Sequence, residues 1–172
     1  MTILNKYESF LQQVAGNPFD CRVPQNITLF ENFKPVVSQK LQPFAKNKAG
    51  CLFCFWKEEQ QEDKWPVVWL DSEGTPNVVF ADNGVDFFSM LPYGTGLIYD
   101  IIRSCERYVN APDTFDSPEV LFADSYATLQ KNTIGLYENS MQLKVSSTPA
   151  QLIFSAYKKW YDVTNIINQG KL

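Results

Sequence analysis

Three short apolar runs follow one another at hairpin distances in the middle of the chain, and they constrain its fold more than any other feature. Residues 51–56 (CLFCFW) are apolar on both faces, as in a central strand, and residues 65–70 (WPVVWL) and 77–81 (NVVFA) come next. The link at residues 57–64 is long and charged, and the link at residues 71–76 has a glycine where a turn needs a positive φ. The pattern predicts three antiparallel strands in a meander.

Helical spacing precedes this meander. Residues 2–15 place apolar side chains on one face and polar ones on the other, which predicts an amphipathic helix that the following Gly-Asn-Pro sequence ends. Three prolines interrupt residues 18–48, which predicts an irregular segment with short extended pieces at residues 27–30 and 35–38.

Helical spacing also follows the meander. Asp82 is expected to cap a helix that ends near Gly94, and a second helix is expected through residues 97–105. The Ser-Pro pair at residues 117–118 favours a helix entry, and residues 148–151 (TPAQ) predict a capping box with Pro in the first turn. The residues expected on the buried side of the helix entered at residue 117 are Leu121, Phe122, Tyr126 and Leu129.

The order of elements predicts an α+β fold, in which several helices flank an antiparallel meander. A length of 172 residues suits one domain, and 45% hydrophobic residues supply a core. No repeat, low-complexity linker or second boundary appears, so we expect residues 1–172 to form a single domain.

Charge is distributed unevenly along the chain. Residues 58–124 carry 3 basic and 14 acidic side chains, a net charge of −11, whereas residues 1–57 carry +4 and residues 125–172 carry +3. An acidic middle would repel nucleic acid and anionic lipid and would steer a basic partner toward the domain. The alternative is that these acids only solvate one face.

The sequence also bears on where the protein works. It has no apolar stretch of the roughly 20 residues that a membrane-spanning helix needs, and its first residues lack the pattern of a secretory signal. Its four cysteines, Cys21, Cys51, Cys54 and Cys105, are expected to be reduced and buried. We therefore expect a cytoplasmic protein with no membrane partner.

Few residues suit catalysis. The chain has no histidine, which removes the commonest general base and metal ligand. Cys51 and Cys54 have half the spacing of a zinc site, but a strand would turn them to opposite faces, and the sequence from Gly94 to Gly96 favours a turn between helices over a phosphate loop.

The acidic residues do not fit a calcium loop, so no metal or other cofactor is expected. An enzyme working without histidine would need a pocket that gathers two or more of a set of carboxylates with shifted pKa values. That set is Asp71, Glu73, Asp82 and Asp86.

The segments PFAKNKAGCLFCFW, WPVVWLDSEG and VVFADNGVDFFSMLPYG, within residues 43–94, resemble the SUKH superfamily as a divergent member. The residues that carry the resemblance are Phe44, Gly50, Phe55, Trp56, Pro66, Leu70, Ser72, Glu73, Gly74, Val79, Ala81, Phe87 and Leu91. The resemblance implies an antiparallel sheet flanked by helices, no enzymatic activity and, as in most bacterial members, an immunity protein that neutralises a cognate toxin.

These observations favour a non-enzymatic immunity protein that binds a toxin domain, such as a nuclease or another effector acting in the cytoplasm, through an acidic surface around the two strand links. The toxin would present a basic surface. The residues expected to contact it are Glu58, Glu59, Glu62, Asp63, Trp65, Asp71, Glu73 and Asp82. The alternative is an endogenous adaptor of cell-wall or secretion machinery, and a toxin gene immediately upstream would favour immunity over it.

Overall fold

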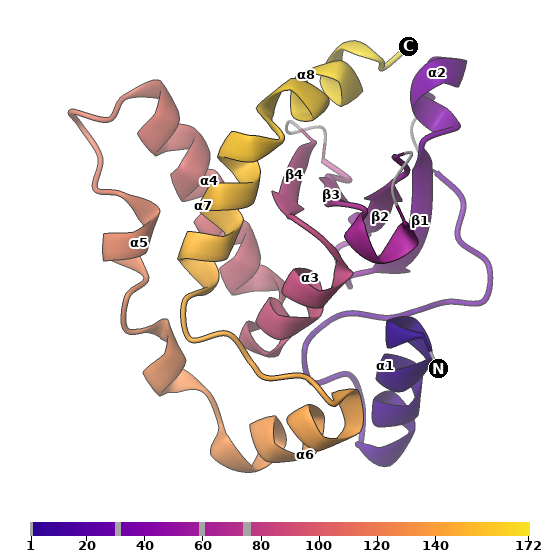
Figure 1. Ribbon diagram of the computed structural model, residues 1–172, viewed down its shortest axis with the longest axis vertical. Coiled ribbons are helices and arrows are strands. Elements are labelled where there is room, and N and C mark those ends of the chain that lie inside the picture. Colours follow the sequence, from indigo (N-terminus) through magenta and orange to yellow (C-terminus); the bar gives the residue numbers. More distant parts are fainter. Residues whose placement is uncertain (1, 30–31, 59–60, 74–76) are drawn as a thin grey trace.

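The computed structural model describes residues 2–29, 32–58, 61–73 and 77–172 (Figure 1). Its sheet is formed by β1 (Leu41–Lys46), β2 (Leu52–Trp56), β3 (Val67–Leu70) and β4 (Val78–Ala81), paired in that order. Every neighbouring pair is antiparallel. The three strands expected from the apolar runs are confirmed, and β1 adds a fourth at the edge beside β2.

Helices before and after the sheet complete an α+β fold, which confirms the expected class. In the described part of the chain the α-helices are α1 (Ile3–Gln13), α2 (Pro35–Ser38), α3 (Gly84–Met90), α4 (Thr95–Asn110), α5 (Pro118–Leu121), α6 (Lys131–Met141), α7 (Pro149–Lys159) and α8 (Tyr161–Gln169). Short 3₁₀ turns lie at η1 (Glu62–Lys64), η2 (Leu91–Tyr93) and η3 (Ser125–Thr128).

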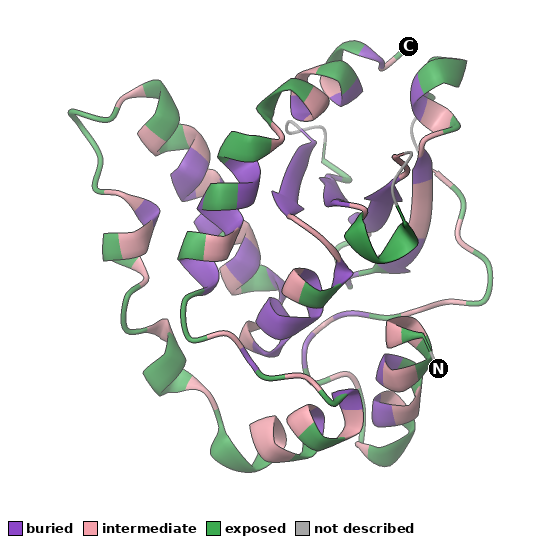
Figure 2. Cartoon of the chain, in the orientation of Figure 1, coloured by how far each residue is buried: buried purple, intermediate pink, exposed green. Residues whose placement is uncertain are grey.

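The sheet is buried on both faces (Figure 2). Alternate side chains of β2 enter two different cores, because successive residues of a strand point to opposite sides. Phe53 and Phe55 join the larger core, with side chains from α1, α3, α4, α6 and α7. Cys54 and Trp56 join the smaller core, which α2 and α8 cover. Cys51 lies in the larger core, so the expected separation of Cys51 and Cys54 is confirmed.

Aromatic rings fill the larger core where α1 meets α6. Phe10 lies edge-on to Tyr137, with ring centroids 5.0 Å apart. The buried Tyr7 hydroxyl donates to the Cys21 carbonyl at 2.9 Å, and the buried Tyr137 hydroxyl donates to the Phe88 carbonyl at 2.7 Å. These bonds satisfy hydroxyls that would otherwise be costly to bury, and the second of them joins α6 to α3.

Two helix starts differ from the expected caps. The predicted capping of α3 by Asp82 is wrong, because the N-cap is Asn83, whose side-chain oxygen accepts from Asp86 N at 2.9 Å. Helix α7 begins at Pro149 as expected, but Thr148 makes no side-chain cap bond, so the capping box does not form. The first helix is confirmed, with Thr2 as its N-cap.

Residues 18–48 and 117–129 hold the larger errors. Residues 35–38, expected to be extended, form α2, and residues 27–29 form no strand, while Phe30 lies outside the described residues. The helix entered at residue 117 is only the four-residue α5, and Leu121 and Tyr126 are exposed instead of buried. Helices α6 and α8 and strand β1 were not expected.

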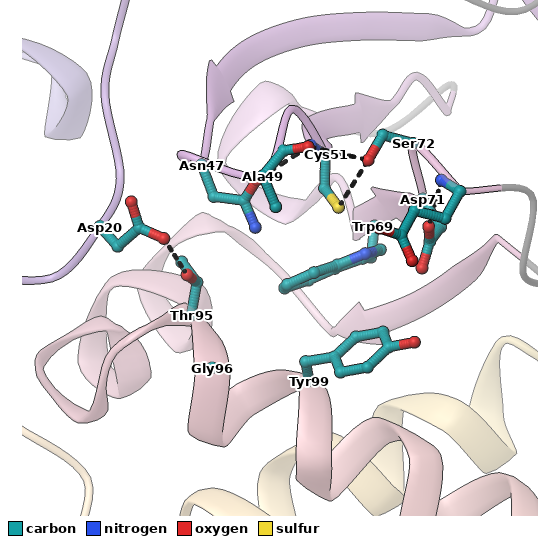
Figure 3. A pocket seen from close by; sticks show the side chains of 11 residues that line it. Asp20, Asn47, Ala49, Cys51, Trp69, Asp71, Ser72, Thr95, Gly96 and Tyr99 are labelled. Atoms are coloured by element: carbon teal, nitrogen blue, oxygen red, sulfur yellow. Dashed lines mark hydrogen bonds between the residues drawn. The ribbon is translucent and has the colours of Figure 1, made fainter.

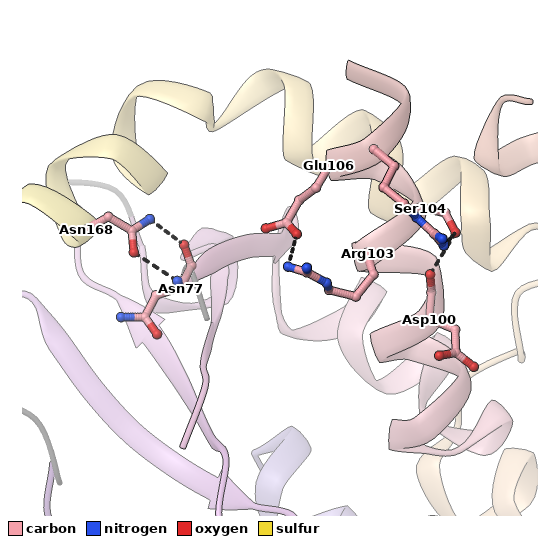
Figure 4. A network of polar contacts seen from close by, with 7 residues as sticks. Asn77, Asp100, Arg103, Ser104, Glu106 and Asn168 are labelled. Carbon is pink, nitrogen blue, oxygen red and sulfur yellow. Dashed lines mark hydrogen bonds and ion pairs between the residues drawn. The ribbon is translucent and has the colours of Figure 1, made fainter. Parts of the chain in front are cut away.

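Side chains of α8 close the outer edge of β4. Thr164 Oγ1 accepts from Val79 N at 3.0 Å. Asn168 accepts from Asn77 N at 2.9 Å and donates to Asn77 O at 2.8 Å (Figure 4). Exposed edges recruit other strands, so these bonds keep β4 from pairing with another chain.

Two further expectations from the sequence concern membrane-spanning helices and the state of the cysteines. No helix in residues 2–29, 32–58, 61–73 or 77–172 is long and apolar enough to cross a membrane. All four cysteines are free and buried, as expected. Burial raises the pKa of Cys21 and of Cys105 to about 12 and raises the pKa of Cys54 as well, so these thiols stay protonated at neutral pH.

Candidate functional site

The expected contact residues are divided between the two ends of the sheet. Because antiparallel strands alternate in direction, the β2–β3 link and the β3–β4 link leave opposite ends of β3. The expected contact residues that come just before β3 or just after β4 lie at one end of the sheet: Glu58, Glu62, Asp63, Trp65 and Asp82. Asp71 and Glu73 lie at the other end, and Glu59 lies outside the described residues. The two links therefore do not form one continuous acidic surface.

A groove of about 420 Å³ opens at the first of these ends, between the start of α1, η1 and the start of α3. We call it the acidic groove. Its lining residues are Thr2, Ile3, Leu4, Phe55, Gln61, Glu62, Asp63, Gly84 and Val85. Glu62 and Asp63 are exposed, and Val85 leaves 46% of its surface to solvent. Of the residues that the structure describes in this lining, none is a lysine or arginine.

Gly84 gives the acidic groove its shape. A Cβ atom at this position would lie 3.3 Å from the Phe55 ring, so a glycine lets the start of α3 approach β2 closely. Asn83 fixes the same helix start by capping it. The apolar floor is therefore held by a capped helix and a central strand.

Glu58 and Trp65 hold the link in place. Trp56 Nε1 donates to Glu58 Oε1 at 2.6 Å, and Lys40 Nζ pairs with the same oxygen at 3.5 Å. Trp65 is half-buried, packs against the larger core and donates its Nε1–H to the Glu58 carbonyl at 3.0 Å. Both residues therefore contribute to the internal structure of the link, and Glu62 and Asp63 are its exposed carboxylates among the described residues, beside the exposed Lys64.

Asp82 also has internal partners. Its carboxylate accepts from Lys159 Nζ at 2.6 Å and from Trp160 Nε1 at 2.6 Å, which joins the end of β4 to the end of α7. Its charge acts on Asp86 as well. Burial, and secondarily the negative charge of Asp82, raises the pKa of Asp86 above its ordinary value.

Asp71 orders the β3–β4 link. It is 4% exposed, its Oδ1 accepts from Glu73 N at 2.7 Å, and its N–H donates to Asn77 Oδ1 at 3.0 Å. Asp71 and the exposed Glu73 line a second pocket at their end of the sheet (Figure 3). Of the four carboxylates named in the enzyme hypothesis, Asp71 and Glu73 share this pocket, and Asp82 and Asp86 lie at the other end of the sheet.

The described residues contain no group of three or more His, Cys, Asp or Glu side chains placed to hold a metal ion. Gly94 has φ of +82° and directly precedes α4, so it forms the turn between helices, while Thr95 and Gly96 belong to α4. This turn follows a 3₁₀ helix and not a strand, unlike a phosphate loop.

The sequence reasoning missed the apolar part of the acidic groove. Ile3, Leu4 and Val85 read as members of buried helix faces, because their spacing is helical. Their position at the first residues of two helices is the signal that could have marked them, since the first turn of a helix often projects beyond the element it packs on.

Comparison of the chain with protein-family models, with curated proteins and with solved structures finds no match.

Proposed function

We propose that this chain is a non-enzymatic immunity protein that neutralises a toxin domain by binding it, and that the acidic groove is its main contact. The observation that carries the proposal is the groove itself, where an apolar floor adjoins the exposed carboxylates of Glu62 and Asp63, with no lysine or arginine among the described lining residues. Its occupant is an apolar side chain of the toxin, flanked by lysine or arginine.

The two parts of the groove contribute differently. Burial of an apolar side chain on Ile3, Leu4 and Val85 supplies affinity, at about 25 cal/mol for each Å² removed from water. The charges of Glu62 and Asp63 mainly raise the association rate and exclude acidic partners. Toxins that act on nucleic acid carry basic surfaces, so such a toxin suits this groove.

The immunity role also draws support from the sequence. The absence of histidine disfavours hydrolytic chemistry, and the SUKH-like segments at residues 43–94 imply toxin neutralisation in most bacterial members of that superfamily. The same proposal places the protein in the cytoplasm, because it must bind the toxin in the compartment where the toxin acts.

The charge of the groove can be tested with the double variant Glu62→Gln/Asp63→Asn. We expect association with the toxin domain encoded beside this chain to slow roughly tenfold at low salt, with the difference closing at high salt. Stopped-flow or surface-based kinetics at several salt concentrations measure this. The matched control, Asp113→Asn/Asp116→Asn, removes two exposed charges from the segment between α4 and α5 and should leave the rate unchanged. Equal rates for the two double variants would rule out the groove.

The immunity role itself can be tested by co-expressing the chain with that toxin domain in bacteria. Survival together with a stoichiometric complex supports immunity by binding. Failure of both would overturn the immunity role and favour the endogenous adaptor, whose partner would belong to cell-wall or secretion machinery.

A further inference from the structure

A second pocket, of about 240 Å³, lies at the end of the sheet opposite the acidic groove (Figure 3). We call it the carboxylate pocket. It is bounded by the β1–β2 turn, the end of β3 with its following link, and the first turns of α4. The lining residues used below are Asp20, Trp69, Asp71, Glu73 and Tyr99.

The lining of the carboxylate pocket has one sign of charge. Asp20, Asp71 and Glu73 contribute three carboxylates, and the described part of the lining has no lysine or arginine. Carboxylates that share a cavity repel one another and attract a cation into it. The charge therefore points to a positively charged occupant.

Asp20 is fixed in place, although its backbone is strained. Its φ is +53°, in the left-handed region that few residues other than glycine adopt. Its Oδ1 accepts from Lys48 N at 3.0 Å and its Oδ2 accepts from Thr95 Oγ1 at 3.0 Å. These bonds connect the β1–β2 turn to α4, and they hold the carboxylate at the pocket before any ligand arrives.

Trp69 supplies a second, independent observation. Its side chain is 97% buried, since 3% of the residue is exposed, and its Nε1 finds no hydrogen-bond acceptor in the part of the chain that the structure describes. Buried indole N–H groups usually have a partner. In Figure 3 the nitrogen edge of the indole faces the side of the pocket where Asp71 lies. An acceptor that enters the pocket would satisfy this donor.

The aromatic rings narrow the class of cation. Trp69 and Tyr99 lie with ring centroids 5.5 Å apart and form one wall of the pocket. A guanidinium is planar, lies flat on aromatic rings and donates to several carboxylate oxygens at once, whereas an ammonium is a compact point charge with no flat face. The acceptor for Trp69 must be neutral, because a second carboxylate from the ligand would meet three others with no basic lining residue to balance it.

We infer that the carboxylate pocket binds an arginine residue in peptide linkage, presented by a partner protein, with the guanidinium between the carboxylates and a backbone carbonyl oxygen accepting from Trp69 Nε1. This inference goes beyond the acidic groove and does not depend on the immunity role. The partner need not be a toxin, because the chemistry that the pocket recognises is one residue of a peptide.

The experiment titrates the ¹⁵N-labelled protein with N-acetyl-L-argininamide and follows the indole N–H signals of its four tryptophans by NMR. Trp69→Phe assigns the Trp69 signal. We expect that signal to shift and saturate, while the isosteric but uncharged N-acetyl-L-citrullinamide leaves it in place. Glu73→Gln, at an exposed position, should weaken binding by about fivefold or more, and Asp113→Asn should not.

Three outcomes would overturn the inference. An unmoved Trp69 signal would mean that no atom of the ligand reaches the indole nitrogen. Equal binding of the citrulline compound would remove the role of charge, and unchanged binding by Glu73→Gln would place the ligand elsewhere. If Trp69→Phe does not fold, the inference is still tested by comparing the affinity of Glu73→Gln for the arginine compound with that of the wild type. No toxin is used in this experiment. A negative result here therefore does not affect the proposal for the acidic groove, and a negative result for the acidic groove does not affect the carboxylate pocket.

Discussion

Single carboxylates in this protein differ in what folding does to them, and Asp86 and Glu138 are opposite cases. Burial beside Asp82 raises the pKa of Asp86. Glu138 accepts from Lys144 Nζ at 2.7 Å and from Val145 N at 2.9 Å, and these bonds lower its pKa. The folded state therefore binds the proton of Asp86 more tightly, and that of Glu138 less tightly, than the unfolded chain does.

The two residues should affect the pH dependence of stability in opposite directions. For Asp86, the free energy of unfolding decreases as pH rises from the ordinary pKa of 3.8 through the raised value, so Asp86→Asn should stabilise the protein at neutral pH. The gain is at most about 1 kcal/mol, because solvent screens a half-buried group. For Glu138, stability is present above the ordinary pKa of 4.5 and is lost as pH falls through the lowered value, so Glu138→Gln should destabilise at neutral pH.

Urea unfolding of both variants at neutral pH and at about pH 4 checks these signs, and both differences from the wild type should shrink at the lower pH. A loss of stability in Asp86→Asn at neutral pH would show that the negative charge at the start of α3 matters more than its burial.

The residue types of the candidate site could be predicted from the sequence, but the partners of those residues could not. The composition of the two strand links shows that they are acidic. Glu62 and Asp63 are exposed, as expected for a charged loop. The role of Asp82 depends on Trp160, which lies 78 positions away and becomes its neighbour only when α7 packs on β4. Aromatic and acidic residues close in sequence suggested a contact surface, whereas Trp56 and Trp65 use their indole nitrogens to hold Glu58.

At the scale of elements, the C-terminal end of α8 fits closely against α2. Lys34 N donates to the Gly170 carbonyl at 2.8 Å, and Leu172 N donates to the Asn32 carbonyl at 3.0 Å. A Cβ atom at Gly170 would lie 2.4 Å from Val37 Cγ2, a distance that packed atoms do not tolerate. Gly135, inside α6, has nothing within 4 Å of the same position.

Alanine at these two glycines should change stability in opposite directions. Gly170→Ala forces α2 away from α8 and should cost about 1–3 kcal/mol. Gly135→Ala removes the backbone freedom of glycine from a helix interior and should add about 0.5–1 kcal/mol. Calorimetry would register each kcal/mol as a shift of about 2–4 °C in Tm. A neutral Gly170→Ala would mean that the contact between α2 and α8 does not form in solution, and Gly135→Ala serves as the internal reference.

The elements that the sequence revealed are those with an uninterrupted pattern. Strands β2, β3 and β4 are continuous apolar runs, whereas β1 contains Pro43 and a register shift between Pro43 and Ala45, which hide its alternation. Residues 35–38, which include the β-branched Val36 and Val37, were expected to be extended, but Pro35 starts a helical turn that carries Val37 into the smaller core. At these residues, burial of Val37 against α8 outweighs the strand propensity of the two valines.

The whole molecule is organised by one sheet between two unequal cores. The larger core lies under five helices and the smaller core under α2 and α8, and every strand of the sheet contributes side chains to both. A change in one core must therefore act on the backbone that the other core packs on. This arrangement suits one cooperative unit, as expected for a single domain of this length.

The four tryptophans can test that unity, because they are divided between the cores. Trp69 belongs to the larger core and Trp65 packs against it, while Trp56 belongs to the smaller core and Trp160 packs against that one. With ¹⁹F-labelled tryptophan, a urea titration followed by NMR reports each position separately. If the sheet couples the two cores, all four native signals should disappear at the same urea midpoint and with the same slope. Earlier loss of the Trp56 and Trp160 signals would mean that the layer formed by α2 and α8 unfolds first as a separate unit.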